Sequence, residues 1–293
     1  MKLIVGTWDP AWGYTWVERG FGKLYALRSL ADGSSLCVDG KEYPTPGRHS
    51  CHITLLPRQA VVSDYTSGTL SLYPLGIDGL PAGEPSLLHF EGHGPHPVRQ
   101  TAPHIHSSWL SPDRKSLIVV DLGTDRIYRF HIADGRIEED GIEVFHLPDG
   151  CGPRHCAFGD GVLYVATELS DEVLVLNWPD MQLKQRIVVN PARPSGGGHV
   201  VLAGKYLYVS SRLENDGIGI FKVLLGGRLE KVGYQRTGAH PRHFCVSGDA
   251  SLLAVACKDD DRIEFYSIDD SSGLLTPVSG SCAAEKPVYV ELV

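Results

Sequence analysis

A short run of glycine, proline, arginine and histidine recurs along the chain, and its spacing limits the fold more than any other feature. Successive copies place His155, His199 and His243 at intervals of 44 residues, and Val288 follows 45 residues later. Repeats of this length are typical of β-propeller blades, whereas most solenoid repeats are shorter. The copies begin at residues 47, 103, 152, 197, 240 and 286.

Each repeat contains short segments that read as strands of an antiparallel meander. In the repeat that begins at 103, an apolar strand is followed by a second at 116–121 and by an alternating third at 126–132. Asp-Gly pairs such as Asp39-Gly40 and Asp134-Gly135 supply the positive φ angles that tight hairpins need. Equivalent third strands are expected at 172–178, 217–223 and 262–268.

Counting the repeats predicts an all-β, seven-bladed β-propeller. Six copies give five complete blades and a final fragment, 286–293, that supplies one strand. Segments 24–27 and 36–38 supply a degenerate earlier blade, and residues 1–45 carry the weakest repeat signal. We expect an N-terminal strand at 2–8 to pair with the final fragment, which closes the array and removes its open edge. All 293 residues then form one domain, 1–293.

Composition and charge exclude several classes of function. The formal net charge is −8 and the basic residues are scattered, which argues against a nucleic-acid partner. No apolar run approaches 18 residues and no export signal is visible, so no membrane association is expected. The seven cysteines form no C-x-x-C pair, and we read them as free thiols of a cytoplasmic protein. The oligomeric state is not readable from the sequence.

Superposing the repeats on their first strands places basic residues at one position. His106, Arg154 and Arg242 are equivalent, and Cys51 and Gly198 take that place in the other two copies. The innermost strands of a propeller surround a central channel, so these three side chains are expected to point into one funnel. Two converging guanidinium groups suit a carboxylate or a phosphate, which they bind bidentately.

A second set of equivalent positions lies at the ends of the second strands. It consists of Tyr65, Leu122, Glu168, Arg212 and Lys258. Glu168 has two interpretations: it neutralises the arginines, or it is a general base, although neighbouring cations would lower its pKa and weaken it.

The histidines also divide into two groups. Those at 49, 155, 199 and 243 recur with the repeat and are read as structural. His106 is different because arginines occupy its equivalent positions, which leaves a structural and a functional role equally open. His104 and His106 flank Ile105 and could share a metal ion, but no further ligand completes a site in local sequence, so no metal is expected. Nucleotide-binding and nucleophile-elbow motifs are missing, and we expect no cofactor.

At this level of detail the sequence resembles the seven-bladed lactonase family. The resemblance covers residues 46–293 and is strongest over 101–172 and 236–268. The blocks that carry it are Pro-His-Ile-His-Ser at 103–107, Ser-Pro-Asp at 111–113, Asp-Leu-Gly-Thr-Asp-Arg-Ile at 121–127, Gly-Pro-Arg-His at 152–155, Glu-Leu at 168–169 and Pro-Arg-His-Phe at 241–244. The chain departs from the family pattern at Thr167, Ser211 and Cys257, where asparagine is usual, and these changes bear on the substrate more than on the fold.

The resemblance implies a metal-free site whose catalytic residues are His106, Arg154, Glu168 and Arg242. The arginines would bind the anionic end of a lactone and stabilise the oxyanion, while His106 or Glu168 activates water. Further residues expected to bind substrate are Arg212, Lys258, Tyr65 and Asp121.

Three functions follow as hypotheses. The first is hydrolysis of a sugar lactone in carbohydrate metabolism, with 6-phosphogluconolactone as the favoured substrate and a small anionic lactone as the only expected partner. The second is a lactonizing reaction on a carboxylated muconate, which would use the same arginines on carboxylates. The third is a non-catalytic propeller that binds a ligand, because propellers are common scaffolds and fold does not fix function.

Overall fold

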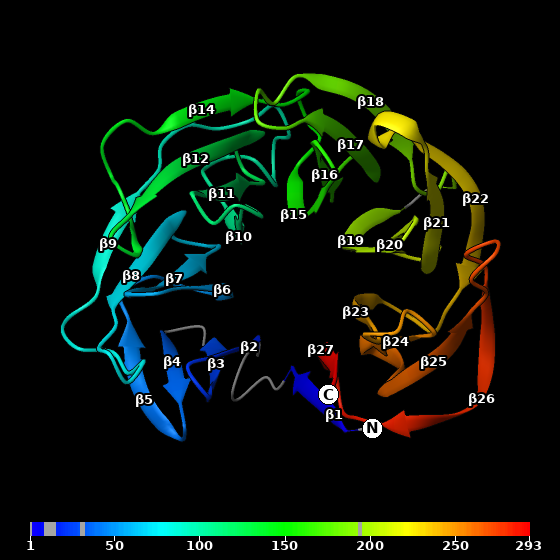
Figure 1. Cartoon of the computed structure of the whole chain (residues 1–293), viewed down its shortest axis with the longest axis horizontal. Coiled ribbons are helices and arrows are strands. Elements are labelled where there is room, and N and C mark those ends of the chain that lie inside the picture. Colours follow the sequence, from blue (N-terminus) through cyan, green and yellow to red (C-terminus); the bar gives the residue numbers. More distant parts are fainter. Residues whose placement is uncertain (1, 9–15, 30–32, 193–194) are drawn as a thin grey trace. The chain divides into compact units, whose positions relative to one another are not determined.

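The computed structural model describes residues 2–8, 16–29, 33–192 and 195–293 (Figure 1). Strands dominate these residues, which contain no α-helix and only two 3-10 turns, Leu225–Gly227 and Lys258–Asp260. The chain forms two compact units. Unit 1 combines Met1–Trp8 with Arg154–Val293, and unit 2 is Asp9–Pro153. Among the described residues, no helix has the length and apolar character that a membrane span requires.

Unit 1 contains three four-stranded sheets in which consecutive strands are neighbours. The predicted third strands at 217–223 and 262–268 are observed with the same limits, and the one predicted at 172–178 ends at Asn177. In Figure 1 the first strands of these sheets lie on one side of the unit and the fourth strands on the opposite side. The strands are β15 (Pro153–Gly159), β16 (Val162–Thr167), β17 (Glu172–Asn177) and β18 (Leu183–Val188); β19 (Gly196–Ala203), β20 (Tyr206–Arg212), β21 (Gly217–Val223) and β22 (Leu229–Arg236); and β23 (Pro241–Val246), β24 (Leu252–Cys257), β25 (Arg262–Ile268) and β26 (Leu275–Ala283).

The two ends of the chain form a further, two-stranded sheet in unit 1. β1 (Leu3–Thr7) pairs antiparallel with β27 (Pro287–Leu292), in a register that sets Leu3 opposite Leu292. Reciprocal main-chain hydrogen bonds of 2.9 Å between Lys2 and Val293 extend the pairing by one residue. The predicted pairing of the N-terminal strand with the C-terminal fragment is confirmed.

Unit 2 contains three more sheets, the last of which has five strands because β13 and β14 both pair with β12. The segment expected to be a degenerate blade is a complete four-stranded sheet, so that expectation was wrong. Its first and last strands could not be predicted because they lack an apolar pattern: β2 carries Glu18 and Arg19, and β5 is mostly exposed. The strands are β2 (Val17–Gly20), β3 (Lys23–Ser29), β4 (Ser34–Val38) and β5 (Lys41–Thr45); β6 (Ser50–Leu56), β7 (Gln59–Asp64), β8 (Thr69–Pro74) and β9 (Ser86–His89); and β10 (Ile105–Leu110), β11 (Ser116–Asp121), β12 (Arg126–Ala133), β13 (Arg136–Ile137) and β14 (Glu143–His146).

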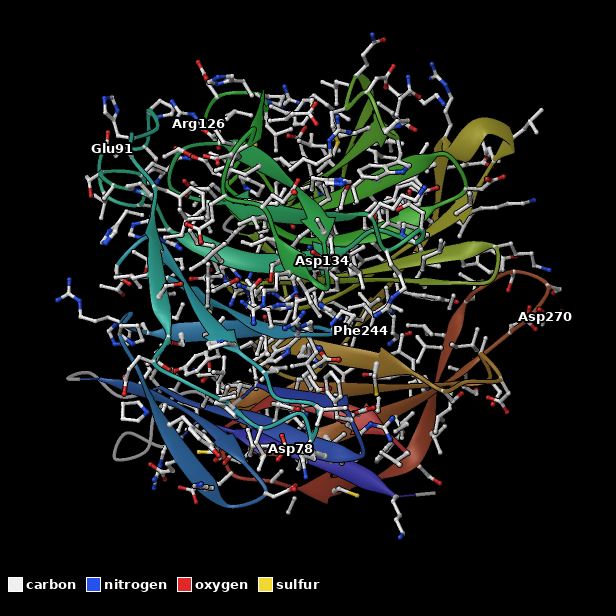
Figure 2. The ribbon with its side chains drawn as sticks, turned by 60° about the vertical axis from the view of Figure 1, so that its left-hand side comes forward. Asp78, Glu91, Arg126, Asp134, Phe244 and Asp270 are labelled. Atoms are coloured by element: carbon white, nitrogen blue, oxygen red, sulfur yellow. The ribbon has the colours of Figure 1, made fainter. Side chains whose placement is uncertain are left out.

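The core consists of apolar layers between consecutive sheets of the same unit. In unit 1, β16 packs on β19, β20 on β23, and β24 on β27. Phe244 is fully buried in the layer between the second and third sheets, whereas Asp270 projects from the edge of the molecule (Figure 2). In unit 2 an equivalent layer joins the sheets that begin with β6 and β10. Each sheet therefore buries an apolar face on the next one in its unit.

The first strands share a local irregularity at the position that the sequence repeat singled out. The strand register shifts at Cys51 in β6, at His106 in β10 and at Arg242 in β23, and β19 shifts between Gly197 and Val200. A β-bulge adds one residue to a strand and redirects its side chain. The repeat thus places His106 and Arg242 on equivalent bulges rather than in regular strand.

Candidate functional site

Two arginines and one glutamate form a buried cluster in unit 1, which we call the arginine–glutamate cluster. Arg154 Nε lies 3.1 Å from Glu168 Oε2, and Arg212 Nη2 donates to the same oxygen. The residues are 0%, 9% and 5% exposed for Arg154, Glu168 and Arg212. The cluster carries one positive charge in excess, which favours a bound anion because buried charges are stable only when compensated.

Each member of the cluster lies at the end of a strand. Arg154 is the second residue of β15, where Gly152 adopts a φ of +62° just before the strand begins. Glu168 follows the last residue of β16, and Arg212 is the last residue of β20. Glu168 and Arg212, which the sequence superposition made equivalent as second-strand ends, therefore meet Arg154 of the first strand β15.

Further contacts fix the outer nitrogens of both arginines. Arg154 Nη1 donates to the carbonyl oxygen of Gly198 at 2.8 Å and lies 3.2 Å from His155 Nε2. Arg212 Nη1 lies 3.2 Å from His240 Nε2. Two different histidines thus contact the two arginines in the same way.

His240 connects the cluster to the remaining basic residues of unit 1. Its Nδ1 lies 3.2 Å from Asp259 Oδ2, and Lys258 Nζ donates to Asp259 Oδ1 at 2.7 Å. Burial, with the charges of Arg212, Arg242 and Lys258, lowers the pKa of His240 to about 3. The predicted residues Arg242 and Lys258 therefore gather with Arg212 around one neutral imidazole.

Sequence reasoning did not assign His240 or Asp259. His240 opens a repeat and precedes the Pro-Arg-His block, so a signal was present, but its φ of +57° and its contact with Asp259 are products of the fold. Asp259 lies in the 3-10 turn after β24, one residue beyond the predicted Lys258.

The predicted residues of unit 2 form a separate group of aromatic contacts. His106 is 4% exposed, and its ring meets the edge of Tyr65 at 5.7 Å. The ring of His104 stacks on Tyr65 at 4.5 Å. Arg99 Nη2 donates to the Tyr65 hydroxyl at 3.1 Å. Cys51 Sγ donates to the carbonyl oxygen of His106, which ties the two bulges together.

Asp121, predicted to bind substrate, holds a turn of unit 2. Its carboxylate is fully buried and accepts hydrogen bonds from the main-chain N of His104 at 2.7 Å, the N of Gly123 at 2.9 Å and the Thr124 hydroxyl at 2.6 Å. Burial raises the pKa of this carboxyl. The Asp121 carboxylate therefore holds the main chain at His104, and its oxygens are occupied by these hydrogen bonds.

His104 Nδ1 lies 2.9 Å from the carbonyl oxygen of Tyr65, a contact that uses one of the two nitrogens a metal could bind. Within the described ranges, no group of three or more histidine, cysteine, aspartate or glutamate side chains is arranged to hold a metal ion.

The histidines read as structural occupy two settings. His155, His199 and His243 are buried, and their rings contact one another in series: His155 Nδ1 lies 2.6 Å from His199 Nδ1, and His199 stacks on His243 at 4.1 Å. The series continues with Tyr289, stacked on His243 at 4.6 Å. His49 instead contacts the hydroxyl of Thr66 at a surface turn.

Comparison with known proteins identifies the family. The model of a family described as lactonase, 7-bladed β-propeller, matches residues 14–292. The chain belongs to this lactonase family. The predicted fold class, an all-β seven-bladed propeller, is thereby confirmed, as is the resemblance on which the site residues were assigned.

The chain is similar to curated proteins over most of its length. It is 31% identical over 271 residues to the 6-phosphogluconolactonase of Bacillus subtilis strain 168, which covers 87% of this chain and 74% of the relative. It is also 31% identical over 332 aligned positions to the 6-phosphogluconolactonase of Yersinia pseudotuberculosis, which covers 99% and 97%.

Solved structures show the same fold. A Bacteroides fragilis protein with a provisional assignment as 6-phosphogluconolactonase superposes on this chain with a TM-score of 0.91 and 28% identity, over 99% of this chain and 97% of the other. The periplasmic gluconolactonase of Pseudomonas aeruginosa gives a TM-score of 0.85 over 99% and 98%, and its 21% identity supports the fold alone.

Proposed function

We propose that this protein hydrolyses the ring ester of a phosphorylated sugar lactone, with 6-phosphogluconolactone as its substrate. The observation that carries the proposal is the convergence of Arg154 and Arg212 on one oxygen of Glu168 in a buried cluster with excess positive charge. The names of the curated relatives support the same substrate. Guanidinium donors bind the oxygens of phosphate in bidentate geometry, as they do those of carboxylates.

The proposed reaction adds water to the lactone carbonyl. The water oxygen bonds to the carbonyl carbon, a base takes one proton, and the carbonyl oxygen becomes an oxyanion that guanidinium groups stabilise. The ring C–O bond then breaks, and the ring oxygen receives a proton to give the hydroxy acid. In this scheme Arg154, Arg212, Arg242 and Lys258 hold the negative charges of the substrate and of the oxyanion.

Two side chains are candidates for the base. Glu168 accepts hydrogen bonds from two guanidinium groups, and such donors stabilise the carboxylate and weaken it as a base. This favours His106 as the base and Glu168 as the residue that orients the arginines. The variants His106→Asn and Glu168→Gln separate the roles, because loss of the base removes the limb of the rate–pH profile that belongs to it.

The decisive experiment measures hydrolysis of freshly prepared 6-phosphogluconolactone above its spontaneous rate. Arg154→Met should abolish the acceleration, while Arg186→Met should keep it, because Arg186 forms an exposed ion pair with Glu172. Circular dichroism of both variants checks the fold. No acceleration with any aldonolactone would overturn the proposal.

The substrate panel also tests the lactonizing alternative. Arginines bind carboxylates as well as phosphates, so a carboxylated muconate and unphosphorylated gluconolactone belong in the panel. We expect the phosphorylated lactone to give the highest kcat/KM. A higher value for the muconate would assign the lactonizing reaction, and binding without turnover of any member would assign a non-catalytic propeller.

We also propose that the protein works in the cytoplasm and as a single domain. All seven cysteines are free, and Cys51, Cys151, Cys156 and Cys257 are buried, as expected for a reducing compartment. Fractionation of cells that express the full chain tests the location, and a periplasmic signal would overturn it.

A further inference from the structure

The two arginines of the arginine–glutamate cluster are held by the same type of contact. In each, Nη1 lies 3.2 Å from the Nε2 of a histidine, His155 for Arg154 and His240 for Arg212. The two histidines belong to different sheets: His155 is the third residue of β15, and His240 precedes β23. The arrangement thus occurs twice, around one glutamate.

These contacts determine where the imidazole protons lie. A guanidinium group has only donors, so each Nε2 must accept and must be without a proton. A neutral imidazole carries one N–H, which is then on Nδ1. Both His155 and His240 are therefore in the Nδ1–H form.

The partner of each Nδ1 agrees with this assignment. His240 Nδ1 lies 3.2 Å from Asp259 Oδ2, an acceptor. His155 Nδ1 lies 2.6 Å from His199 Nδ1, so His155 donates, His199 accepts, and the proton of His199 is on Nε2. A hydrogen-bonded chain consequently runs from Arg154 through His155 to His199.

We propose that His155 and His240 are positioning residues, which in their Nδ1–H form fix the guanidinium groups of Arg154 and Arg212 for substrate binding. With Nη1 held by an imidazole and a second nitrogen held by Glu168, each guanidinium plane has one orientation. The inference rests on the proposed function, because it assigns these residues to the arginines that would bind the lactone.

The surroundings of His240 keep its imidazole neutral. Arg212 faces it from β20, Arg242 from β23, and Lys258 from the turn after β24. Asp259 is the acid that faces the ring, and Asp216 accepts a hydrogen bond from the main chain of His240. A second proton on Nε2 would remove the acceptor of Arg212 and place two donors against each other. The low pKa of His240, about 3, agrees with this geometry.

The first test reads the proton positions directly and needs no enzymatic activity. Long-range ¹H–¹⁵N NMR of the full protein with labelled histidine at pH 7 should show Nδ1–H for His155 and His240 and Nε2–H for His199. His→Gln variants at each position assign the signals. An Nε2–H or doubly protonated ring at His155 or His240 would overturn the proposal even if lactonase activity is present.

The second test compares a variant that removes the acceptor with one that keeps it. His240→Leu should lower kcat/KM for 6-phosphogluconolactone about tenfold or more, the effect expected for a lost hydrogen bond to a charged group. His240→Gln, whose amide oxygen can take the place of Nε2, should remain within about threefold of the parent. His131→Leu, on the exposed surface of β12, is the matched control.

The outcomes are separable. Equal losses in His240→Leu and His240→Gln, with both variants folded by circular dichroism, would overturn the positioning role. If the parent hydrolyses no lactone, the proposed function fails alone, and the comparison is made on the dissociation constant for inorganic phosphate. There, too, an effect of His240→Leu that His240→Gln does not rescue would contradict the proposal.

Discussion

Glu168 is the residue on which the charge balance of the site depends. It compensates two buried guanidinium groups, and removing one member of a buried ion pair typically costs about 3–5 kcal/mol. We predict that Glu168→Gln lowers the free energy of unfolding by about 3 kcal/mol and that inorganic phosphate restores part of it by supplying the missing negative charge. Urea unfolding with and without phosphate measures both effects.

The matched control is Glu172→Gln, which breaks the partly exposed pair between Glu172 and Arg186. Pairs of this kind contribute about 0–1 kcal/mol, so the control should stay near the parent and respond little to phosphate. Equal destabilisation of the two variants would show that Glu168 has no special compensating role.

Asp64 makes the stability of the protein depend on pH. It is fully buried, accepts hydrogen bonds from the hydroxyls of Ser50, Thr69 and Ser71, and has a pKa raised by burial to about 6. The folded state therefore holds this proton more tightly than the unfolded state, whose carboxyl has a pKa near 3.8. Its stabilising contribution is present below about pH 4 and is lost as the pH rises to about 6.

We predict that Asp64→Asn removes this dependence. Relative to the variant, the parent should lose about 2–3 kcal/mol of unfolding free energy between pH 4 and pH 7, because its carboxyl titrates near 6 when folded and near 3.8 when unfolded. Urea unfolding of both proteins across this range gives the difference. A difference that does not change with pH, or one of opposite sign, would contradict the prediction.

At the scale of residues, the sequence predicted those contacts that the repeat itself encodes. Arg154 and Glu168 occupy repeat positions at strand ends, and the structure brings them together. His240 was missed because its contact needs a left-handed backbone and the return of Asp259 in a 3-10 turn. His240 opens a repeat, but nothing in the sequence links it to Asp259.

At the scale of elements, burial determined what could be predicted. The second strand β11 and the third strands β21 and β25 carry regularly placed apolar residues, and their predicted limits agree with the structure. The predicted ends of β12 and β17 each differ by one residue. The repeat pattern located three strands in each unit, and the sheets have a fourth. That outer strand is mostly exposed in β18 and β26, so its residues lack the apolar alternation on which the prediction relied.

The burial of β27 leads to a prediction about the stability of the protein. Val290 is fully buried and packs with Ala254, Ala256 and Ile263 of the neighbouring sheet. Val290→Ala should destabilise the protein by about 2 kcal/mol through lost apolar contact and the cavity left behind. Chemical denaturation measures the change. Val293→Ala, at a half-exposed position, is the control and should stay within about 0.5 kcal/mol.

At the scale of the whole molecule, we predict that the chain unfolds as a single domain. Unit 1 is assembled from both ends of the chain, with unit 2 between them in sequence. Because each sheet needs its neighbour to bury an apolar face, we predict one cooperative unfolding transition. Hydrogen–deuterium exchange in increasing urea should give the same midpoint for peptides from β6–β12 and from β16–β25. Two separate midpoints would show that the units unfold as independent domains.

The sheet formed by β1 and β27 also sets an order of events during synthesis. β1 leaves the ribosome before every other described strand, and its partner β27 leaves it after all of them. Until Pro287–Leu292 emerges, the nascent protein carries an apolar strand with open main-chain donors and acceptors, which chaperones and proteases recognise. A translation product that stops before β27 keeps that exposed edge, so synthesis of Pro287–Leu292 decides whether β1 is covered.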